Sequence, residues 1–237
     1  MYTGTGIYSL GEAGRLIGVP SAQLSRWLFG YKYQKRRDGM AVAGYSAPLW
    51  SPQVTEGEAS KTIGFQDLLE ARFVHAFVSH GVPLLVVRRC LVSAQQLYGV
   101  PYPFTTLRFK TDGKSIFGEA VRQSVDEDPL IDLRSRQVVF REIIVPSLYA
   151  GIEYQGEHAS KWYPVPKRDH IVLDPARHFG SPINEDTGIP TEALHASYLA
   201  EGGDERAAAL TAATYDIPLR WVKAAIRYES QLAKASH

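Results

Sequence analysis

The sequence has few of the features that mark secreted, membrane-spanning or disulfide-bonded proteins. It contains one cysteine, Cys90, so no disulfide can form within the chain. Cys90 lies in the apolar run PLLVVRRCLV, and we interpret it as a buried hydrophobic residue. No run approaches the roughly 18 apolar residues of a membrane helix, and the first residues lack the pattern of a signal peptide. We therefore expect a cytoplasmic protein with no membrane partner.

Motifs for catalysis and cofactor binding are also missing. The seven histidines show no HExxH or similar ligand spacing, and no serine lies in a G-x-S-x-G turn. The stretch TDGKS lacks the glycine that a phosphate-binding loop needs five residues before Gly113, where Arg108 lies. The acidic run Asp126, Glu127 and Asp128 is more typical of a solvated loop than of a metal site. We expect no enzyme activity, no cofactor and no metal.

Charge is distributed unevenly along the 237 residues, although the net charge is only +1. Residues 1–48 contain six Lys or Arg against two Asp or Glu, a net charge of +4. Residues 148–237 contain nine Lys or Arg against twelve Asp or Glu, a net charge of −3. A polyanion would be attracted to the beginning of the chain and repelled by its end.

The stretch YSLGEAGRLIGVPSAQLSRW predicts two short helices separated by a tight turn. Ser9 followed three residues later by Glu12 forms a capping box, which is typical of a helix start. We expect this helix to run to about Ile17. Gly18 then turns the chain without steric cost, and Pro20 cannot continue the helix.

The second predicted helix runs from Ser21 to about Phe29. Leu24, Trp27 and Leu28 have the spacing of one buried helical stripe, and the small Gly14 suits the place where the helices cross. This is helix-turn-helix spacing, in which the second helix enters the DNA major groove. An ordinary helical hairpin remains the alternative, because the motif is short. The predicted DNA-contacting residues on the outer face are Ser21, Gln23, Ser25 and Arg26.

A basic hairpin is predicted next, in the stretch YKYQKRRDGMAVAGY. Asp38-Gly39 is a strong signal for a tight turn between two strands. A basic hairpin directly after a recognition helix is typical of a wing whose cations contact DNA phosphates. A solvated surface loop is the alternative. The predicted phosphate contacts are Lys32, Lys35, Arg36 and Arg37.

A second helical pair follows, one helix over residues 65–77 and another opened by Pro83. The run from the helix-turn-helix to TIGFQDLLEARFVHAFVSHGVPLLVVRRCLVSA resembles the DNA-binding domain of MerR-like regulators. The order of the parts is similar, as are the phrases F-x-D-L, G-V and V-R-R. The resemblance covers about the first 98 residues and departs from the family in its longer link, SAPLWSPQVTEGEASK.

The middle of the chain predicts β structure. FTTLRFKTDGKSIF alternates apolar and polar residues around Asp112-Gly113 and indicates a hairpin, and LIDLRSRQVVF indicates another. REIIVPSLYAGIEY is predicted to form a helix and KWYPV a short strand.

The last third predicts three short helices, with Asp204 as an N-cap and Pro218 in a first helical turn. The stretch HIVLDPARHFGSPINEDTGIPTEAL resembles a small helix-turn-helix domain found in VapB-type antitoxins. That domain has an I-x-x-D-P phrase, an F-G-x-P phrase, a G-T-R-I-P box and a final A-x-R-Y helix. Here the box is DTGIP, with Asp186 in place of glycine and Gly188 in place of arginine.

These parts predict a mainly α protein with small β elements, of the α+β class. The predicted segments are a winged helix-turn-helix domain at 1–98, a middle segment containing β-hairpins at 99–166, and a C-terminal three-helix domain at 167–237.

Taken together, the parts resemble the larger antitoxins of VapBC-type toxin–antitoxin systems. The resemblance implies a protein that binds its own operator DNA and neutralises a cognate PIN-type ribonuclease. The acidic, metal-holding centre of such a nuclease would accept an inserted arginine, for which Arg220 and Arg227 on the final helix are the candidates. A single winged helix contacts few base pairs, so we expect a homodimer on an inverted repeat, or a higher oligomer.

The alternative is a MerR-like transcriptional regulator whose middle segment binds a small effector. Its candidate pocket aromatics are Tyr98, Tyr102, Phe104 and Trp162, although such aromatic residues more often lie in the core. A neighbouring gene for a PIN-like nuclease would favour the antitoxin, whereas an efflux or metabolic operon would favour the regulator.

Overall fold

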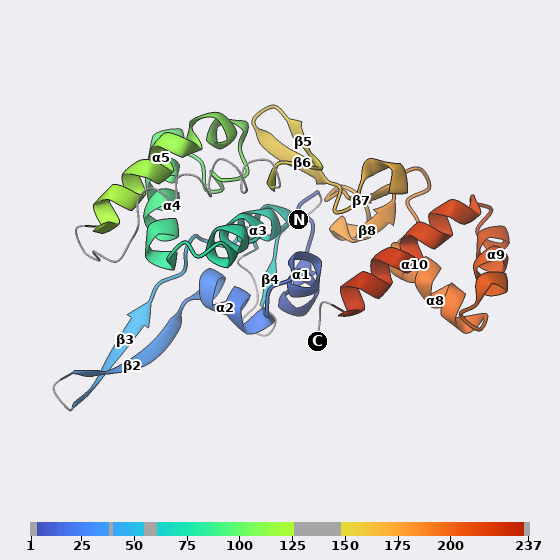
Figure 1. Ribbon diagram of the computed structural model, residues 1–237, viewed down its shortest axis with the longest axis horizontal. Coiled ribbons are helices and arrows are strands. Elements are labelled where there is room, and N and C mark those ends of the chain that lie inside the picture. Colours follow the sequence, from blue (N-terminus) through green and yellow to red (C-terminus); the bar gives the residue numbers. More distant parts are fainter. Residues whose placement is uncertain (1–3, 38–39, 55–60, 126–147, 235–237) are drawn as a thin grey trace. The chain divides into compact units, whose positions relative to one another are not determined.

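The computed structural model describes residues 4–37, 40–54, 61–125 and 148–234 (Figure 1). The chain divides into two compact units, which we call the head unit, Ser9–Tyr149, and the tail unit, Ala150–His237 with the first eight residues. Both contain helices and short antiparallel strands, which confirms the predicted α+β class. The predicted segments 1–98, 99–166 and 167–237 follow motifs rather than contacts, and they stay predictions.

The first elements of the chain match the local signals in its sequence. The Ser9 hydroxyl accepts a hydrogen bond from the backbone N–H of Glu12 at 3.1 Å, which confirms the predicted helix cap. Gly18 ends the helix in the left-handed conformation, with φ of 70°. A side chain at Gly14 would clash with the carbonyl oxygen of Val19, so the turn itself requires this glycine. These elements are β1 (Tyr8–Ser9), α1 (Leu10–Ile17) and α2 (Ser21–Phe29).

The predicted basic hairpin is present and projects from the helices of the head unit (Figure 1). Its strands are β2 (Tyr31–Arg37) and β3 (Met40–Ser46). They pair antiparallel from Tyr31 opposite Ser46 to Arg37 opposite Met40. We call this hairpin, residues 31–46, the wing.

The rest of the head unit packs around aromatic rings. The ring centroid of Phe77 lies 5.5 Å from that of Phe117 and 5.3 Å from that of Phe104, and Phe73 meets Tyr149 edge-on at 5.0 Å. The buried Cys90 confirms its interpretation as a core residue. The helical pair predicted from 65 and from Pro83 is confirmed. The elements are β4 (Thr62–Ile63), α3 (Phe65–Ser79), α4 (Leu84–Tyr98) and α5 (Leu107–Val125).

The hairpin predicted over residues 104–117 is wrong, because this stretch begins helix α5. Phe109, Phe117 and Val121 are buried at a helical rather than an alternating period. The Thr106 hydroxyl accepts from the backbone N–H of Phe109 at 3.2 Å and caps the helix start. Neither α5 nor any other helix in the described part of the chain is long and apolar enough to cross a membrane.

The remaining predictions for the middle have mixed outcomes. The hairpin predicted over 130–140 lies outside the described residues. The helix predicted over 141–154 is wrong at its end, where residues 152–154 begin a strand, and residues 141–147 are not described. The strand predicted over 161–165 overlaps the observed strand His158–Trp162.

The tail unit contains a four-stranded antiparallel sheet in the order β5-β6-β7-β8. The sheet joins strands from both sides of the predicted boundary at residue 166. A 3-10 helix, Lys167–Asp169, and a tight turn, His178–Gly180, flank β7 in the sequence. The strands are β5 (Ile152–Gln155), β6 (His158–Trp162), β7 (Ile171–Leu173) and β8 (Pro182–Asn184).

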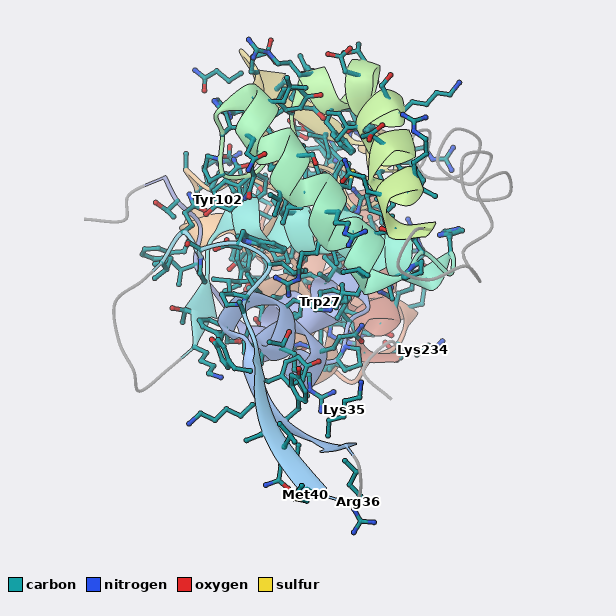
Figure 2. All side chains as sticks on the ribbon, turned by 90° about the vertical axis from the view of Figure 1, so that its left-hand side faces the viewer. Trp27, Lys35, Arg36, Met40, Tyr102 and Lys234 are labelled. Carbon is teal, nitrogen blue, oxygen red and sulfur yellow. The ribbon has the colours of Figure 1, made fainter. Side chains whose placement is uncertain are left out.

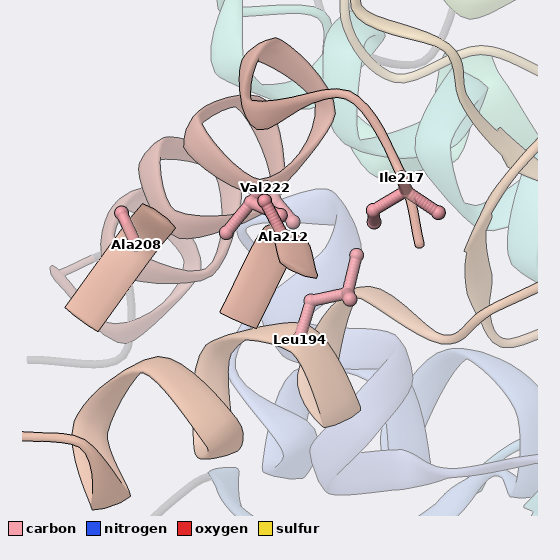
Figure 3. Packing of buried hydrophobic residues seen from close by; sticks show 6 residues of the cluster. Leu194, Ala208, Ala212, Ile217 and Val222 are labelled. Carbon is pink, nitrogen blue, oxygen red and sulfur yellow. The ribbon is translucent and has the colours of Figure 1, made fainter. Parts of the chain in front are cut away.

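Three helices complete the tail unit, as predicted. Asp204 caps the second of them by accepting a hydrogen bond from the backbone N–H of Ala207 at 2.8 Å. The helices share an apolar core, shown in Figure 3, of Leu194, Ala208, Ala212, Ile217, Val222 and Ala225. Their bounds are α8 (Thr191–Ala200), α9 (Glu205–Thr214) and α10 (Leu219–Lys234).

Candidate DNA interface and partner-binding residues

Helix α2 has a buried and an outer face, as its spacing predicts. Leu24, Trp27 and Leu28 are buried in the head unit. Ser21 and Arg26 are exposed, whereas Gln23 and Ser25 are half-buried at the edge of the outer face. The four predicted DNA-contacting residues of this helix are therefore separate from the side chains that hold it in place.

Arg26, the one basic residue of α2, contacts the wing. The guanidinium carbon of Arg26 lies 5.6 Å from the centroid of the Tyr31 ring, a cation–π arrangement. Tyr31 is the first residue of β2. The base of the wing thus restricts the direction of the side chain that suits guanine. No sequence pattern indicates this role for Tyr31.

Lys61, which the sequence analysis does not predict as a contact, lies beside the same helix. The Nζ atom of Lys61 donates to the hydroxyl of Ser25 at 2.9 Å and lies 5.1 Å from the centroid of the Phe29 ring. Lys61 therefore adds a cation to the outer side of α2, and the Ser25 hydroxyl oxygen is occupied as the acceptor of its hydrogen bond. The two residues are 36 positions apart, so no local spacing pattern could have found this contact.

The wing presents two faces of different chemistry. Because side chains alternate along a strand, Lys32 and Arg36 share one face, and Lys35 lies on the other. On that second face Tyr33, Val42 and their neighbours line a hollow of about 300 Å³. The predicted wing cations therefore cannot all meet the same surface. Figure 2 shows Lys35, Arg36 and Met40 on the outer part of the wing, where Met40 is 71% exposed.

The chain that follows the wing is bound by Arg88, the first arginine of the V-R-R phrase on α4. Arg88 donates to the backbone oxygens of Pro48 at 2.8 Å and Ala47 at 2.7 Å. The backbone N–H of Leu49 donates to the Trp27 carbonyl at 2.7 Å. These bonds join the end of the wing to both α4 and the end of α2.

The F-x-D-L phrase holds the longer link that follows the wing. The buried carboxylate of Asp67 accepts hydrogen bonds from the Trp50 indole at 2.8 Å and from the backbone N–H groups of Gln53 and Gly64 at 2.9 Å. Burial raises the pKa of this carboxyl, and the three bonds oppose that shift. One side chain on α3 thus anchors both described ends of the link.

A second buried carboxyl joins α3 to the start of α5. Glu70 accepts from the backbone N–H groups of Phe104 at 3.1 Å and Thr105 at 3.2 Å. Burial is the main cause that raises the pKa of Glu70 to about 8, and nearby Asp67 adds to the shift. Glu70 therefore supports the head unit from inside and lies on no candidate binding surface.

The aromatic residues proposed for an effector pocket are divided between the two units. Phe104 is fully buried, with its ring centroid 4.7 Å from that of Phe109. Trp162 is buried in the tail unit, on strand β6. Tyr102 donates to the Ser51 carbonyl at 3.4 Å, and burial raises the pKa of Tyr98 to about 12. Phe104 and Trp162 are thus core residues.

No group of three or more His, Cys, Asp or Glu suited to a metal ion occurs among the residues that the structure describes. The acidic run Asp126, Glu127 and Asp128 lies outside them.

The two candidate arginines of the tail differ in how they are engaged. Arg227 forms an ion pair with Asp169, with 3.2 Å between Nη2 and Oδ1. Arg220 is exposed, and its guanidinium lies 5.6 Å from the Trp221 ring centroid. Inserting Arg227 into a partner would require breaking its ion pair, so Arg220 is the better placed of the two.

The altered DTGIP box lies beside the guanidinium of Arg177. Gly188 has φ of 77°, and a Cβ atom there would lie 2.7 Å from Nη2 of Arg177. Arg177 also donates to the Glu185 carbonyl at 2.8 Å. Arg177 thus lies beside the position at which the resembled box has arginine. The neighbouring Asp186 carboxylate lies 2.6 Å from Nδ1 of His170.

Comparison with known proteins identifies a match to a described domain family in the first part of the chain. Residues 6–91 match a family model described as "Putative DNA-binding HTH domain". This range includes α2, the wing and most of the helical pair that supports them. The match supports a DNA-binding role for this part of the chain.

Two similar proteins and one similar solved structure come from Mycobacterium tuberculosis. The chain is 28% identical over 192 residues to the "Putative antitoxin VapB45", an alignment covering 77% of this chain and 78% of that protein. It is 24% identical over 229 residues to the uncharacterized protein Rv2308, covering 94% and 89%. The crystal structure of Rv2018 has a TM-score of 0.66 and 21% identity, covering 95% of this chain and all of that one, which shows a shared fold.

Proposed function

We propose that the chain is the antitoxin of a type II toxin–antitoxin system. In this proposal it binds operator DNA with its head unit and neutralises a PIN-type ribonuclease with its tail unit. One observation carries the proposal. A helix-turn-helix with a basic wing coincides with the matched DNA-binding domain, in a chain whose similarity to a protein named as an antitoxin extends over 77% of its length.

The head works as a MerR-like winged helix-turn-helix. Helix α2 enters the major groove, where Gln23 suits adenine and Arg26 suits guanine. Lys32 and Arg36, which share a face of the wing, contact phosphates and add affinity that depends on salt. A homodimer presents two such heads to an inverted repeat.

The tail binds the nuclease and performs no catalysis itself. A ribonuclease needs a basic surface to attract RNA, and residues 148–237 have a net charge of −3, which would draw that surface to them. Arg220, which is exposed, is the candidate for the acidic nuclease centre.

Co-expression with the product of the adjacent gene tests the antitoxin role. The full-length protein should retain that product through purification and inhibit its ribonuclease activity, and Arg220→Glu should weaken the inhibition. Arg206→Glu is the matched control, since Arg206 is an exposed cation at the start of α9 in the same unit. Absence of any complex with a nuclease from the adjacent gene would contradict the proposal.

Full-length variants are preferable to fragments in this test. A fragment ending near Pro166 would remove β7 and β8 and leave β5 and β6 without the rest of their sheet. Its failure to bind a nuclease would then reflect loss of the fold.

A further inference from the structure

Phe179 combines two energetically unfavourable features. Its backbone is in the left-handed region, with φ of 54° and ψ of 23°, and the preceding residue, His178, has φ of 45°. Left-handed backbone is costly for residues other than glycine, asparagine and aspartate. The Phe179 side chain is also 74% exposed, the largest exposed fraction among the exposed large hydrophobic residues described. An asparagine or glycine here would avoid both costs.

The surrounding structure holds the backbone of Phe179 in this conformation. The backbone N–H of Ile7 donates to the Phe179 carbonyl at 2.9 Å, and the Tyr8 hydroxyl donates to the Gly180 carbonyl at 2.8 Å in a buried bond. Within the loop, Ser181 N–H donates to the His178 carbonyl at 3.1 Å. Strained residues persist where several bonds fix them, and they concentrate at functional sites.

We infer that Phe179 anchors the tail unit to the nuclease of the proposed function. Its aromatic ring inserts into an apolar pocket on that nuclease. The inference rests on that function. An aromatic side chain on a backbone that is already fixed loses little conformational entropy on binding. Buried aromatic residues of this kind are common among the residues that contribute most of the binding energy of an interface.

The net charge of the tail unit favours a nuclease over two other partners, DNA and a second copy of the tail unit. Residues 148–237 have a net charge of −3, which disfavours DNA as the partner of the tail unit as a whole. A contact between two copies of the tail would bring like charges together. A nuclease with a basic rim has the complementary charge.

The variant Phe179→Asn separates anchoring from folding. Asparagine tolerates the left-handed conformation and removes the exposed ring, so the melting temperature of the full-length protein should rise by about 2–4 °C. The affinity for the purified product of the adjacent gene, measured by calorimetry, should fall at least about 10-fold. Phe179→Tyr, which keeps an aromatic ring on the same backbone, should retain the affinity.

Leu210→Gln is the matched control, because Leu210 is an exposed apolar residue of the same unit on ordinary helical backbone. It should leave the affinity unchanged. Undiminished nuclease affinity of Phe179→Asn, or a lower melting temperature, would overturn the inference. A change in oligomeric state in place of nuclease affinity would assign Phe179 to a contact between copies and would also overturn it. If the wild-type protein binds no nuclease, the proposed function itself fails.

Discussion

The guanidinium of Arg26 lies over the ring of Tyr31, 5.6 Å from its centroid, so a side chain of the wing contacts a side chain on the outer face of α2. Arg26 is the residue of α2 that suits guanine, and its direction depends on the first residue of β2. In the proposed function, the wing therefore has a second role beyond the proposed phosphate contacts, which is to orient the side chain proposed to read a base.

We predict that Tyr31→Ala weakens base preference at the position read by Arg26, whereas Tyr31→Phe preserves it. An exposed cation–π pair contributes about 0.5–1 kcal/mol, so the preference should fall by about 2- to 5-fold. Selection of binding sites from a randomised duplex pool measures this preference. Tyr45→Ala, at an exposed tyrosine of the same hairpin, is the control and should leave the preference intact. Equal effects of Tyr31→Ala and Tyr45→Ala would show that Tyr31 does not orient Arg26.

The tip of the wing should contribute affinity without sequence information. Replacing Arg36 by alanine should weaken binding to all duplexes alike and lower the slope of log affinity against log salt by about one unit, the contribution of one phosphate contact. The controls are Arg168→Ala and Arg206→Ala, at exposed cations of the tail unit. A salt slope that stays unchanged would exclude the wing tip from the interface.

The two faces of α2 should separate folding from DNA recognition. Trp27 is buried, so Trp27→Ala should lower the free energy of unfolding by about 3–5 kcal/mol. Gln23→Ala should leave that free energy nearly unchanged and relax base preference at one position. Urea unfolding and site selection on both variants provide the comparison. Equal destabilisation by the two substitutions would show that the faces are assigned wrongly.

Burial of Glu70 should make the protein less stable as pH rises. Its pKa is about 8 in the folded chain against an ordinary value of 4.5. The folded state therefore favours the protonated carboxyl, and this contribution is complete below about pH 4.5 and is lost as pH rises to about 8. Stability should fall by up to about 1.4 kcal/mol per pH unit within that window.

Glu70→Gln should remove this slope, because the amide does not titrate and still offers an oxygen to Phe104 and Thr105. Urea unfolding between pH 5.5 and 8.5 measures the difference between wild type and variant. Glu119→Gln, at an exposed carboxyl of α5, should keep the wild-type slope. If Glu70→Gln kept it too, Glu70 would be ionised in the folded state.

The parts of the fold that could be predicted have strong local signals. Ser9 and Glu12 mark the start of α1, Gly18 marks its end, and Asp38-Gly39 lies between two strands. The hairpin prediction fails at α5 because the helical period of the buried apolar residues, and not the turn signal Asp112-Gly113, matches the structure there. Contacts with α3, such as the stacking of Phe77 on Phe117, hold this helix and leave no trace in its own sequence.

The same contrast applies to the candidate site. The outer face of α2 follows from its 3.6-residue period, so the exposure of Arg26 could be predicted. The Lys61–Ser25 bond and the Arg227–Asp169 ion pair join residues far apart in the sequence. Such pairings are set by the tertiary structure, and a single sequence carries no pattern for them.

In the proposed function, the outer face of α2 reads a DNA sequence. The most direct test of this claim is the affinity of the full-length protein, at about 150 mM salt, for the DNA upstream of its own gene and for a scrambled duplex of the same composition. We predict binding at least about 1,000-fold tighter to the upstream DNA, and a ratio at least about 10-fold smaller for Gln23→Ala combined with Arg26→Ala, with unfolding unchanged. Equal affinity of the wild-type protein for both duplexes, or an unchanged ratio in the double variant, would contradict the claim.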